Sequence, residues 1–438
     1  MSLRDTAIRV VERLRDAGFE AYFVGGCVRD KLLGVEPHDY DITTSAKPDE
    51  VKGLFDKVVE VGSQFGVSCV CVDGEWFEVA TFRKDLSYSD GRRPDAVEFT
   101  DAKGDVSRRD FTINGLLYDP IKDEVIDHVG GEDDIKNKLI RCIGDPATRF
   151  AEDKLRLLRA IRFAARLGYE IELTTLRAFP AAVAEIDQVS SERIGVELLA
   201  ILSGPNAKRG LQLLDETRLL IRLLPEVHAM KGVEQPAQFH PEGDVFTHTM
   251  LTLETMSGPS PELALAALLH DVGKPPTFQE TDRIRFNDHA RVGSNMAAKI
   301  CRRLKMPNSI TDAVADLVAT HMTFIDVQAM RESRLKRFLR EPSFEDALEL
   351  HRLDCLASHG NLDTWRWCHD RYAELEPDQV HPPRLISGHD LIEMGYPPGP
   401  KFKEILDGLE DAQLEGKLDT QEQAFEFVNR QFPLVELQ

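Results

Sequence analysis

The chain has 438 residues, 42% of them hydrophobic, and is long enough for about two to four domains with buried cores. Its net charge of −21 argues against indiscriminate binding of nucleic acid. The seven cysteines are scattered and form no C-x-x-C pair, which argues against a disulfide framework and favours a reducing compartment.

Targeting and membrane signals are missing from the sequence. The longest apolar run covers residues 263–269, far short of the roughly 18 residues that a membrane span needs. The N-terminal residues follow the pattern of an amphipathic helix and have no apolar signal core. We therefore expect a cytoplasmic protein with no membrane partner and no disulfide-linked partner.

The first 140 residues alternate between helical and extended patterns. A helix is expected at about 3–17, ending at Gly18, and extended segments are expected at 19–24, 57–61, 67–72 and 76–82. A turn at Asp73-Gly74 joins the last two into a hairpin. Residues 84–105, centred on Arg92-Arg93-Pro94, predict a mobile loop. From about residue 150 the pattern is helical, and no strong strand signal follows residue 145.

The most informative cluster begins directly after the first expected strand. Gly25 and Gly26 let backbone N–H groups approach an anion closely, and Arg29 adds a positive fork suited to phosphate. Asp39 and Asp41 follow one residue apart, so both side chains point to one side if the segment is extended. Paired carboxylates suit Mg²⁺, which usually shares its oxygen ligands with substrate phosphates.

The Asp-x-Asp pattern alone is more typical of a polar turn after a strand, and it is the neighbouring glycines, Arg29 and Asp30 that favour the metal and phosphate site. Glu78, in an apolar strand pattern, is either a third acid beside this pair or the partner of Arg83 or Arg109 in a salt bridge. The sequence leaves those two roles open.

Further arginines lie downstream. Arg108, Arg109 and Asp110 form a group that can hold triphosphate oxygens, although such neighbours are also common on protein surfaces. Residues 141–177 contain eight Lys or Arg and five Asp or Glu, a local positive excess in an acidic chain. Such a segment is compatible with gripping one phosphate-bearing ligand.

Residues 152–163 predict a helix whose apolar stripe includes Leu155, Leu158 and Ile161. Asp153 and Arg156 are three residues apart, so they are expected to share a helical face, which Arg159 and Arg162 continue.

A solvated face with an ordinary ion pair is the simpler interpretation of this helix. The alternative is a base reader, in which the carboxylate of Asp153 accepts and the guanidinium of Arg156 donates. Cytosine and adenine both offer an amino donor beside a ring-nitrogen acceptor, whereas guanine and uracil place a carbonyl where the amine would be. Such a pair would therefore accept C and A and reject G and U.

The succession GGCVRD, DYD, EVATFR, RRPD, RRDFTIN, EDKLRLLRAIRF and SSERIGVELL resembles the class II tRNA nucleotidyltransferase family, the bacterial CCA-adding enzymes, over about residues 20–225. The resemblance implies an α+β nucleotidyltransferase head, with a mixed sheet and helices, followed by a largely all-α neck, body and tail. It implies template-independent addition of C, C and A to the tRNA 3′ end from CTP and ATP, with release of pyrophosphate. It also implies that the loop at 84–105 supports terminal A addition.

The same resemblance assigns roles to individual residues. Asp39 and Asp41 are implied to be the catalytic Mg²⁺ ligands. The implied nucleotide-binding residues are Gly26, Arg29, Arg109, Asp153, Arg156, Arg159 and Arg162.

A second pattern lies in the C-terminal half, where His270-Asp271 follows an apolar helix and remote histidines and an aspartate accompany it. The pattern resembles an HD phosphohydrolase domain, as found in longer bacterial relatives. By that resemblance a second divalent metal would be held by His248, His270, Asp271 and Asp354, with His289 and His321 lining the pocket. His351 or His359 could replace Asp354, and a domain that has lost its activity is the alternative.

These patterns divide the chain into five parts. We expect a head at 1–140, a neck at 141–205, a body at 206–240, an HD-type domain at 241–375 and a helical tail at 376–438.

Three other functions remain to be weighed. An A-only enzyme or a poly(A) polymerase of the same family shares the metal and phosphate motifs, although the acidic charge disfavours holding generic RNA. An HD phosphohydrolase with a nucleotide-sensing N-terminal domain would not need Asp39 and Asp41. A non-catalytic RNA-binding protein would need neither metal pattern.

Overall fold

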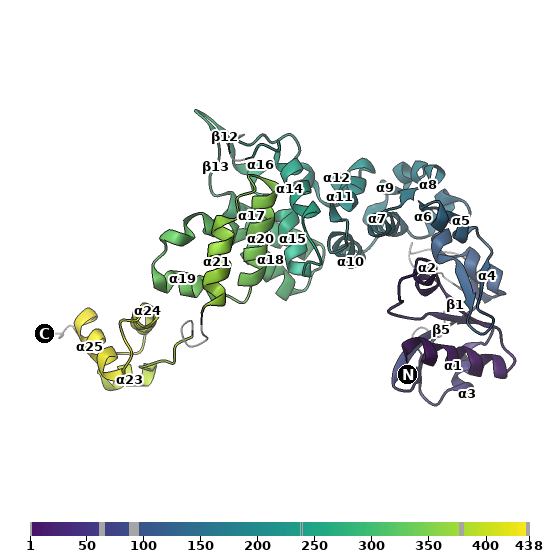
Figure 1. Ribbon diagram of the computed structural model, residues 1–438, viewed down its shortest axis with the longest axis horizontal. Coiled ribbons are helices and arrows are strands. Elements are labelled where there is room, and N and C mark those ends of the chain that lie inside the picture. Colours follow the sequence, from purple (N-terminus) through teal and green to yellow (C-terminus); the bar gives the residue numbers. More distant parts are fainter. Residues whose placement is uncertain are drawn as a thin grey trace. The chain divides into compact units, whose positions relative to one another are not determined.

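The computed structural model describes residues 2–60, 66–86, 96–236, 238, 240–375 and 381–434 (Figure 1). The chain forms two compact units. The first comprises Met1–His228 with Arg303–Lys305, and the second comprises Ala229–Arg302 with Met306–Gln438. No helix among the described residues is long and apolar enough to cross a membrane.

The first unit begins with a seven-stranded sheet of order β3-β4-β5-β2-β1-β8-β9. β2 and β5 run parallel and the other pairs are antiparallel, so the sheet is mixed, as predicted. Its strands are β1 (Ala21–Val24), β2 (Ile42–Thr44), β3 (Val58–Glu60), β4 (Val67–Val72), β5 (Glu75–Thr81), β8 (Leu116–Asp119) and β9 (Glu124–Asp127). The accompanying helices are α1 (Leu3–Asp16), α2 (Gly26–Leu32), α3 (Pro48–Leu54), α4 (Ala102–Ser107) and α5 (Gly131–Lys136).

Local sequence explains the boundaries of these elements. Ser2 and Asp5 form a capping box at the start of α1, and Gly18 follows its end with φ +90°. Asp73 (φ 53°) and Gly74 (φ 89°) both have positive φ, as the tight turn between β4 and β5 requires. The predicted helix and strands agree with the structure to within two residues at each end.

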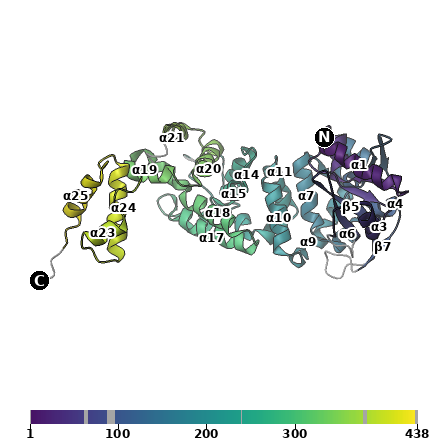
Figure 2. The ribbon, with the colours of Figure 1, turned by 90° about the horizontal axis from the view of Figure 1, so that it is seen from below.

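Helices follow the sheet in the first unit. They are α6 (Pro146–Glu152), α7 (Arg156–Leu167), α8 (Leu173–Arg177), α9 (Phe179–Val183), α10 (Ser191–Leu202), α11 (Ala207–Glu216), α12 (Leu219–Leu223) and α13 (Pro225–His228). α7 packs against α10 and α11 (Figure 2). Leu158, Ile161 and Ala164 are fully buried, which confirms the predicted apolar stripe. The burial of that stripe leaves the arginines of α7 on its other side.

The second unit is built around one apolar helix. α15 (Pro261–Leu269) is buried along residues 263–269 and packs against α14 (Val245–Glu254), α18 (Asn308–Thr320) and α20 (Phe344–Ala357). The remaining helices are α16 (Lys274–Thr277), α17 (His289–Arg303), α19 (Glu332–Leu339), α21 (Asp363–Ala373), α23 (Gly388–Glu393), α24 (Pro400–Leu414) and α25 (Gln421–Gln431), with a 3₁₀ segment at His321–Ala329. The last three helices share a small core of their own that includes Leu391, Leu409 and Val428.

The expectation of no strands after residue 145 is wrong. β10 (Leu139–Ile140) pairs with β11 (Glu170–Ile171), and β12 (Phe278–Glu280) forms a hairpin with β13 (Ile284–Phe286). These strands are two or three residues long, too short for an alternating pattern to be visible in the sequence.

The predicted loop at 84–105 is also partly ordered. Within it β6 (Arg83–Asp85) pairs with β7 (Val97–Phe99), and α4 begins at Ala102. Arg92, Arg93 and Pro94 lie outside the described residues.

Candidate active site

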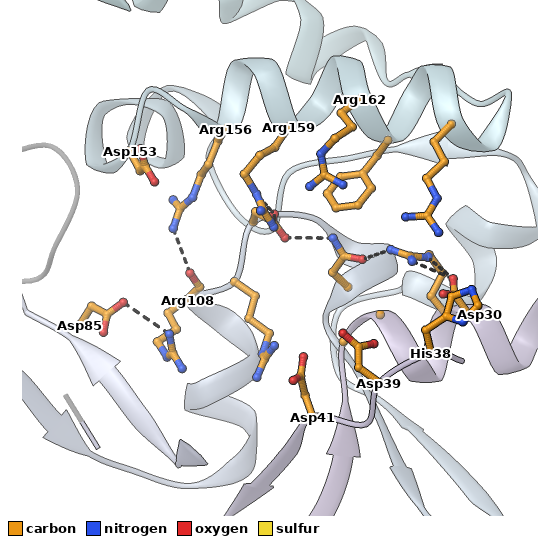
Figure 3. Close-up of a pocket in the computed structure, with 18 of the residues that line it drawn as sticks. Asp30, His38, Asp39, Asp41, Asp85, Arg108, Asp153, Arg156, Arg159 and Arg162 are labelled. Atoms are coloured by element: carbon orange, nitrogen blue, oxygen red, sulfur yellow. Dashed lines mark hydrogen bonds and ion pairs between the residues drawn. The ribbon is translucent and has the colours of Figure 1, made fainter. Parts of the chain in front are cut away.

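One pocket of about 550 Å³ lies in the first unit. It is lined by the β1–α2 turn, the segment before β2, residues after α4, and α7 (Figure 3). The structure brings together here all nine residues that the sequence implies for catalysis and nucleotide binding: Gly26, Arg29, Asp39, Asp41, Arg109, Asp153, Arg156, Arg159 and Arg162.

The carboxylates of Asp39 and Asp41 both line the pocket (Figure 3). Tyr40 between them is buried and packs against Phe23, with ring centroids 5.1 Å apart. Because Tyr40 anchors the segment in the core, its two neighbours turn the other way, as the alternation predicts.

The environment of Asp41 disfavours the negative charge on its carboxylate. Burial and the negative charges of Asp39 and Glu78 raise the pKa of Asp41 to about 6. Glu78 is close because Ile42 pairs with Val79 in the parallel β2–β5 register. Carboxylates gathered at such a cost fit a divalent cation with oxygen ligands.

The turn from β1 to α2 supplies the positive side of the pocket. Gly25 has φ 79°, which turns the chain sharply into α2. Arg29 is buried and held in place, because its Nη1 donates to Asn114 Oδ1 at 2.7 Å and its Nη2 donates to Asp30 Oδ1 at 2.7 Å. The guanidinium is therefore positioned before any ligand arrives.

Two buried aspartates, missed as site residues by the sequence interpretation, position the other arginines. Asp105 accepts from Arg108 Nη2 at 2.7 Å and from Arg109 Nη2 at 3.3 Å. Burial disfavours the charge on Asp105, but these two arginines outweigh it and hold its pKa below the usual range. Asp105 falls in the predicted loop, and no motif marks it as a site residue.

Asp110 links the sheet region to α7. It accepts from Arg159 Nε at 2.8 Å, from the Phe111 amide at 2.8 Å and from Asn114 Nδ2 at 3.2 Å. Burial raises the pKa of Asp110, but Arg159 and these hydrogen bonds outweigh burial and lower it overall. Asp110 and Asn114 belong to the RRDFTIN motif, and that motif is the sequence signal from which their place in the site could have been predicted.

Asp153 and Arg156 do not share a helical face, so that expectation is wrong. Asp153 caps the end of α6 with an extended backbone (φ −146°), and α7 begins only at Arg156. The break arises because Asp153 Oδ1 accepts from the Leu155 amide at 3.0 Å, a local bond that competes with helix. The helix break brings the two residues to one pocket (Figure 3).

Both residues already have partners. Arg193 Nη2 donates to Asp153 Oδ2 at 2.6 Å. Arg156 Nη1 donates to Glu152 Oε2 at 2.6 Å, and Arg156 Nη2 donates to the Arg108 carbonyl at 3.2 Å. Farther along α7, Arg162 pairs with Glu197 at 2.7 Å and lies 4.3 Å from the centre of the Phe163 ring.

The second unit gathers histidines and aspartates from five segments. His248 Nε2 lies 3.2 Å from His270 Nε2 and 3.0 Å from Asp354 Oδ1. His270 Nε2 lies 3.3 Å from Asp271 Oδ2. The four residues implied as a second metal set are therefore adjacent, and His289 and His321 lie beside them.

Neither of the alternatives to Asp354, His351 and His359, belongs to a group of ligand atoms close enough to share a metal ion among the described residues. His351 stacks on Phe324 with centroids 4.5 Å apart, and His359 accepts from the Asn361 amide. Glu242, which the sequence interpretation missed, contacts His248 Nδ1 at 2.7 Å. The sequence offered only its place in the His-Pro-Glu segment near His248.

The pKa values of two histidines in this cluster are shifted in opposite directions. Burial opposes a charge on His248, yet hydrogen bonds with Asp354 and Glu242 raise its pKa to about 9. Burial, together with the positive charge of His270, lowers the pKa of His321 to about 4. Three groups among the described residues have ligand atoms close enough to share a metal ion: His240, Glu242 and His248; His248, His270 and Asp354; and Asp271, His289 and His321.

Three family models match the chain. One described as the poly A polymerase head domain matches residues 21–141, and one described as the probable RNA and SrmB-binding site of polymerase A matches residues 168–231. The HD domain matches residues 245–357.

Curated relatives and solved structures agree with these matches. A CCA-adding enzyme of Geobacillus sp. (strain WCH70) is 32% identical over 94% of this chain and 93% of that protein. One of Ligilactobacillus salivarius (strain UCC118) is 45% identical, but the match spans only 49% of this chain and about half (53%) of the relative's length. The crystal structure of the Bacillus stearothermophilus CCA-adding enzyme in complex with CTP superposes with a TM-score of 0.75, at 28% identity and 98% coverage of both chains.

Proposed function

Because the chain belongs to the family of CCA-adding enzymes, we propose that it is a nucleotidyltransferase that adds C, C and A to the 3′ end of tRNA from CTP and ATP. The observation that carries this proposal is the single pocket that holds paired carboxylates, fixed arginines and the Asp153/Arg156 pair together. We also propose that the enzyme acts on tRNA in the cytoplasm.

We assign the chemistry to the acidic end of the pocket. Asp39 and Asp41 would hold Mg²⁺, which when bound neutralises phosphate charge and activates the 3′-hydroxyl. The tRNA 3′-oxygen forms a bond to the α-phosphorus, the bond from that phosphorus to the bridging oxygen breaks, and pyrophosphate leaves. The hydroxyl proton is lost to solvent. The residues' part is to fix the ions and the two reacting oxygens in line.

The arginines and the glycine turn would hold the triphosphate. Arg29 is locked by Asn114 and Asp30, and Arg109 by Asp105, so neither loses much side-chain freedom when an anion binds. The backbone at Gly26 is open to close approach, since even an added Cβ would lie 3.7 Å from its nearest neighbour, Arg29 Nη2. Arg159 and Arg162 would contact the nucleotide from α7.

Base selection would come from Asp153 and Arg156. Their polar atoms contact Arg193 and Glu152, so binding a base requires an exchange of partners. A base with an amino donor next to an acceptor can replace both partners, whereas uracil or guanine would leave a carbonyl facing Asp153.

Replacing Asp153 with alanine should relax this selection. We expect the preference for CTP over UTP, and for ATP over GTP, to fall about tenfold or more, since one discriminating contact is worth about 1–3 kcal/mol. The measurement is kcat/KM for each nucleotide separately. Glu192→Ala, an exposed carboxylate at the start of α10, is the control and should keep the preference. Unchanged discrimination in Asp153→Ala would remove Asp153 from base selection.

The direct test of the whole function uses three tRNAs, ending before CCA, after the first C, and after CC. Each is incubated with CTP, ATP or both. An enzyme that adds all of CCA should extend all three tRNAs to the same CCA end when CTP and ATP are both supplied. Extension of only the third by ATP would indicate an A-only enzyme, and long A tails would indicate a poly(A) polymerase.

A second activity is favoured by the histidine–aspartate cluster in the HD region. We infer that His248, His270, Asp271 and Asp354 hold a divalent cation and that this unit hydrolyses phosphate esters. The ester bond from phosphorus to the alcohol oxygen breaks, a bond from phosphorus to a water oxygen forms, and the water's proton ends on the alcohol. The test of this hydrolysis is the release of p-nitrophenol from p-nitrophenyl phosphate or from bis(p-nitrophenyl) phosphate. We expect His270→Ala to lose that activity.

The five-part division at 140, 205, 240 and 375 remains our proposal for how these tasks are distributed. The head would perform the transfer and the neck would select the base. The body, which the match to an RNA-binding site partly covers, would hold tRNA, the HD-type region would carry hydrolysis, and the tail would be structural.

A further inference from the structure

One arginine of the pocket in the first unit differs from the others in its charge partners. Seven arginines that line the pocket lie within ion-pair distance of a carboxylate: Arg29, Arg83, Arg108, Arg109, Arg156, Arg159 and Arg162. Arg166 lines the same pocket and is exposed, and no carboxylate among the described residues lies at that distance from it. Its positive charge is therefore available to an anionic ligand.

The place of Arg166 on α7 directs its side chain into the pocket. Arg159 and Arg162 point from α7 into the pocket (Figure 3). Arg166 follows them by seven and four residues, so the three lie on one face of the helix. Gly168, with φ 66°, ends α7 two residues later, and a cation in this last turn is stabilised by the helix dipole. The dipole explains a positive charge at this end of α7 but not its place on the pocket face.

The order of contacts along α7 indicates which part of a nucleotide would reach Arg166. Arg156 begins the helix and would contact the base. Arg29, which would hold the triphosphate, lies 5.4 Å from the centre of the Phe163 ring, and Arg162 lies 4.3 Å from the same centre. Since a helix rises about 1.5 Å per residue, Phe163 lies about 10 Å and Arg166 about 15 Å along the axis from Arg156. Arg166 therefore lies beyond the triphosphate arginines, on the side away from the base.

From this order we propose that Arg166 contacts the terminal phosphate of the incoming triphosphate and then holds the leaving pyrophosphate. The inference rests on the proposed nucleotidyl transfer for its substrate. When the bond between the α-phosphorus and the bridging oxygen breaks, its electron pair passes to the pyrophosphate. A guanidinium beside the terminal phosphate stabilises that added negative charge through charge-assisted hydrogen bonds. Arg166 thus assists departure of the leaving group, and in the reverse reaction it assists capture of pyrophosphate.

Binding of an anion at Arg166 requires no exchange of ion-pair partners. Arg156, at the other end of α7, must give up Glu152 before it can contact a base. Arg166 has no carboxylate to give up among the described residues, so the cost of binding is the ordering of its side chain. The two ends of the nucleotide are held in different ways, and Arg166 should therefore affect the affinity for pyrophosphate without affecting the choice of base.

The first test measures binding of imidodiphosphate, a pyrophosphate analogue whose NH bridge resists hydrolysis, to the full-length protein with Mg²⁺ by isothermal titration calorimetry. Arg166→Gln should bind it about fivefold more weakly than the unmodified protein, as expected for loss of an exposed charge contact. Binding of CMP, which lacks the β- and γ-phosphates, should be unchanged. Arg177→Gln, which alters an exposed last-turn arginine of α8 outside the pocket, is the matched control and should change neither affinity. Any binding in the second unit is common to all these proteins, so only the differences count.

The reverse reaction supplies a second readout. With tRNA ending in CCA as substrate, Arg166→Gln should need about five times as much pyrophosphate for half-maximal release of ATP. In the forward reaction its preference for CTP over UTP should stay the same. A phosphate of the tRNA backbone is the other anion that an exposed arginine could hold. Weaker tRNA binding by Arg166→Gln in a filter assay, with unchanged binding of imidodiphosphate, would overturn the proposal and assign Arg166 to tRNA.

Failure of this inference is distinguishable from failure of the proposed function. Equal binding of imidodiphosphate by Arg166→Gln and the unmodified protein, with both folded by circular dichroism, overturns the role of Arg166. If the unmodified protein still extends tRNA in that case, the transferase stands. If the unmodified protein extends none of the three tRNAs but binds imidodiphosphate more tightly than Arg166→Gln does, the anion contact at Arg166 stands and the transferase proposal fails.

Discussion

Asp41→Asn is expected to reduce incorporation of both CTP and ATP at least about 10³-fold, equivalent to about 4 kcal/mol of activation free energy. Both nucleotides should be affected equally, because the carboxylate pair would act on the phosphates and the 3′-oxygen and not on the base. Asn keeps the shape of the side chain but removes the negative charge that a magnesium ion needs.

The same substitution should not destabilise the protein. The pKa of Asp41 is raised to about 6 in the folded state, so folding favours its protonated form. A carboxyl group with a raised pKa opposes folding progressively as pH rises from the unfolded value near 4 towards 6, and above that the full cost is present. In EDTA at pH 7.5, Asp41→Asn should therefore melt at the same temperature as the unmodified protein or higher.

Single-turnover extension separates chemistry from binding in this test. A tRNA ending before CCA is supplied with CTP, and one ending after CC with ATP. Asp56→Asn, an exposed aspartate after α3, is the matched control and should extend both at the normal rate. Near-normal extension by Asp41→Asn would show that the metal assignment is wrong. Glu78→Gln belongs in the same series, since a loss as large as that of Asp41→Asn would identify a third ligand.

The sequence predicts the pocket well where function is encoded in short motifs. The Gly25–Gly26 turn, Asp39 and Asp41 lie within one strand–helix–strand stretch, and local alternation is enough to aim the two carboxylates. The same holds for the arginines of α7, because helical periodicity separates them from the buried stripe.

The sequence-based predictions fail where the role of a side chain depends on a partner that is distant in the chain. Asp153 reads as helical by spacing, but its bonds to the Leu155 amide and to Arg193 hold it outside the helix. Asp105 is unremarkable in sequence and becomes important only because it is buried against Arg108 and Arg109. The gathering of His248, His289 and His321 around Asp271 likewise depends on the fold, since these residues come from elements separated along the chain.

Asp110→Asn is expected to weaken the junction between the head and α7 by about 2–3 kcal/mol. The change leaves the guanidinium of Arg159 without its buried counter-charge and turns an amide N–H towards it. Breaking a fully buried pair typically costs about 3–5 kcal/mol. A smaller loss is expected here because the Arg159 side chain is 34% exposed and the bond from the Phe111 amide can survive.

Hydrogen exchange of peptides covering α7 and residues 105–115 measures this loss locally, which matters in a chain of two units. Asp187→Asn is the matched control, because its pair with Arg222 is exposed and should contribute about 0.5 kcal/mol or less. The pKa of Asp110 is lowered in the folded state, so the stabilisation is present at neutral pH and is lost as pH falls below the unfolded value near 4. The unmodified protein and Asp110→Asn should therefore differ in the stability of α7 at pH 7 and become equal in stability under acid conditions. If Asp110→Asn and Asp187→Asn cost the same at pH 7, Asp110 does not hold α7 to the head, and the position of the base-selecting residues must depend on other contacts.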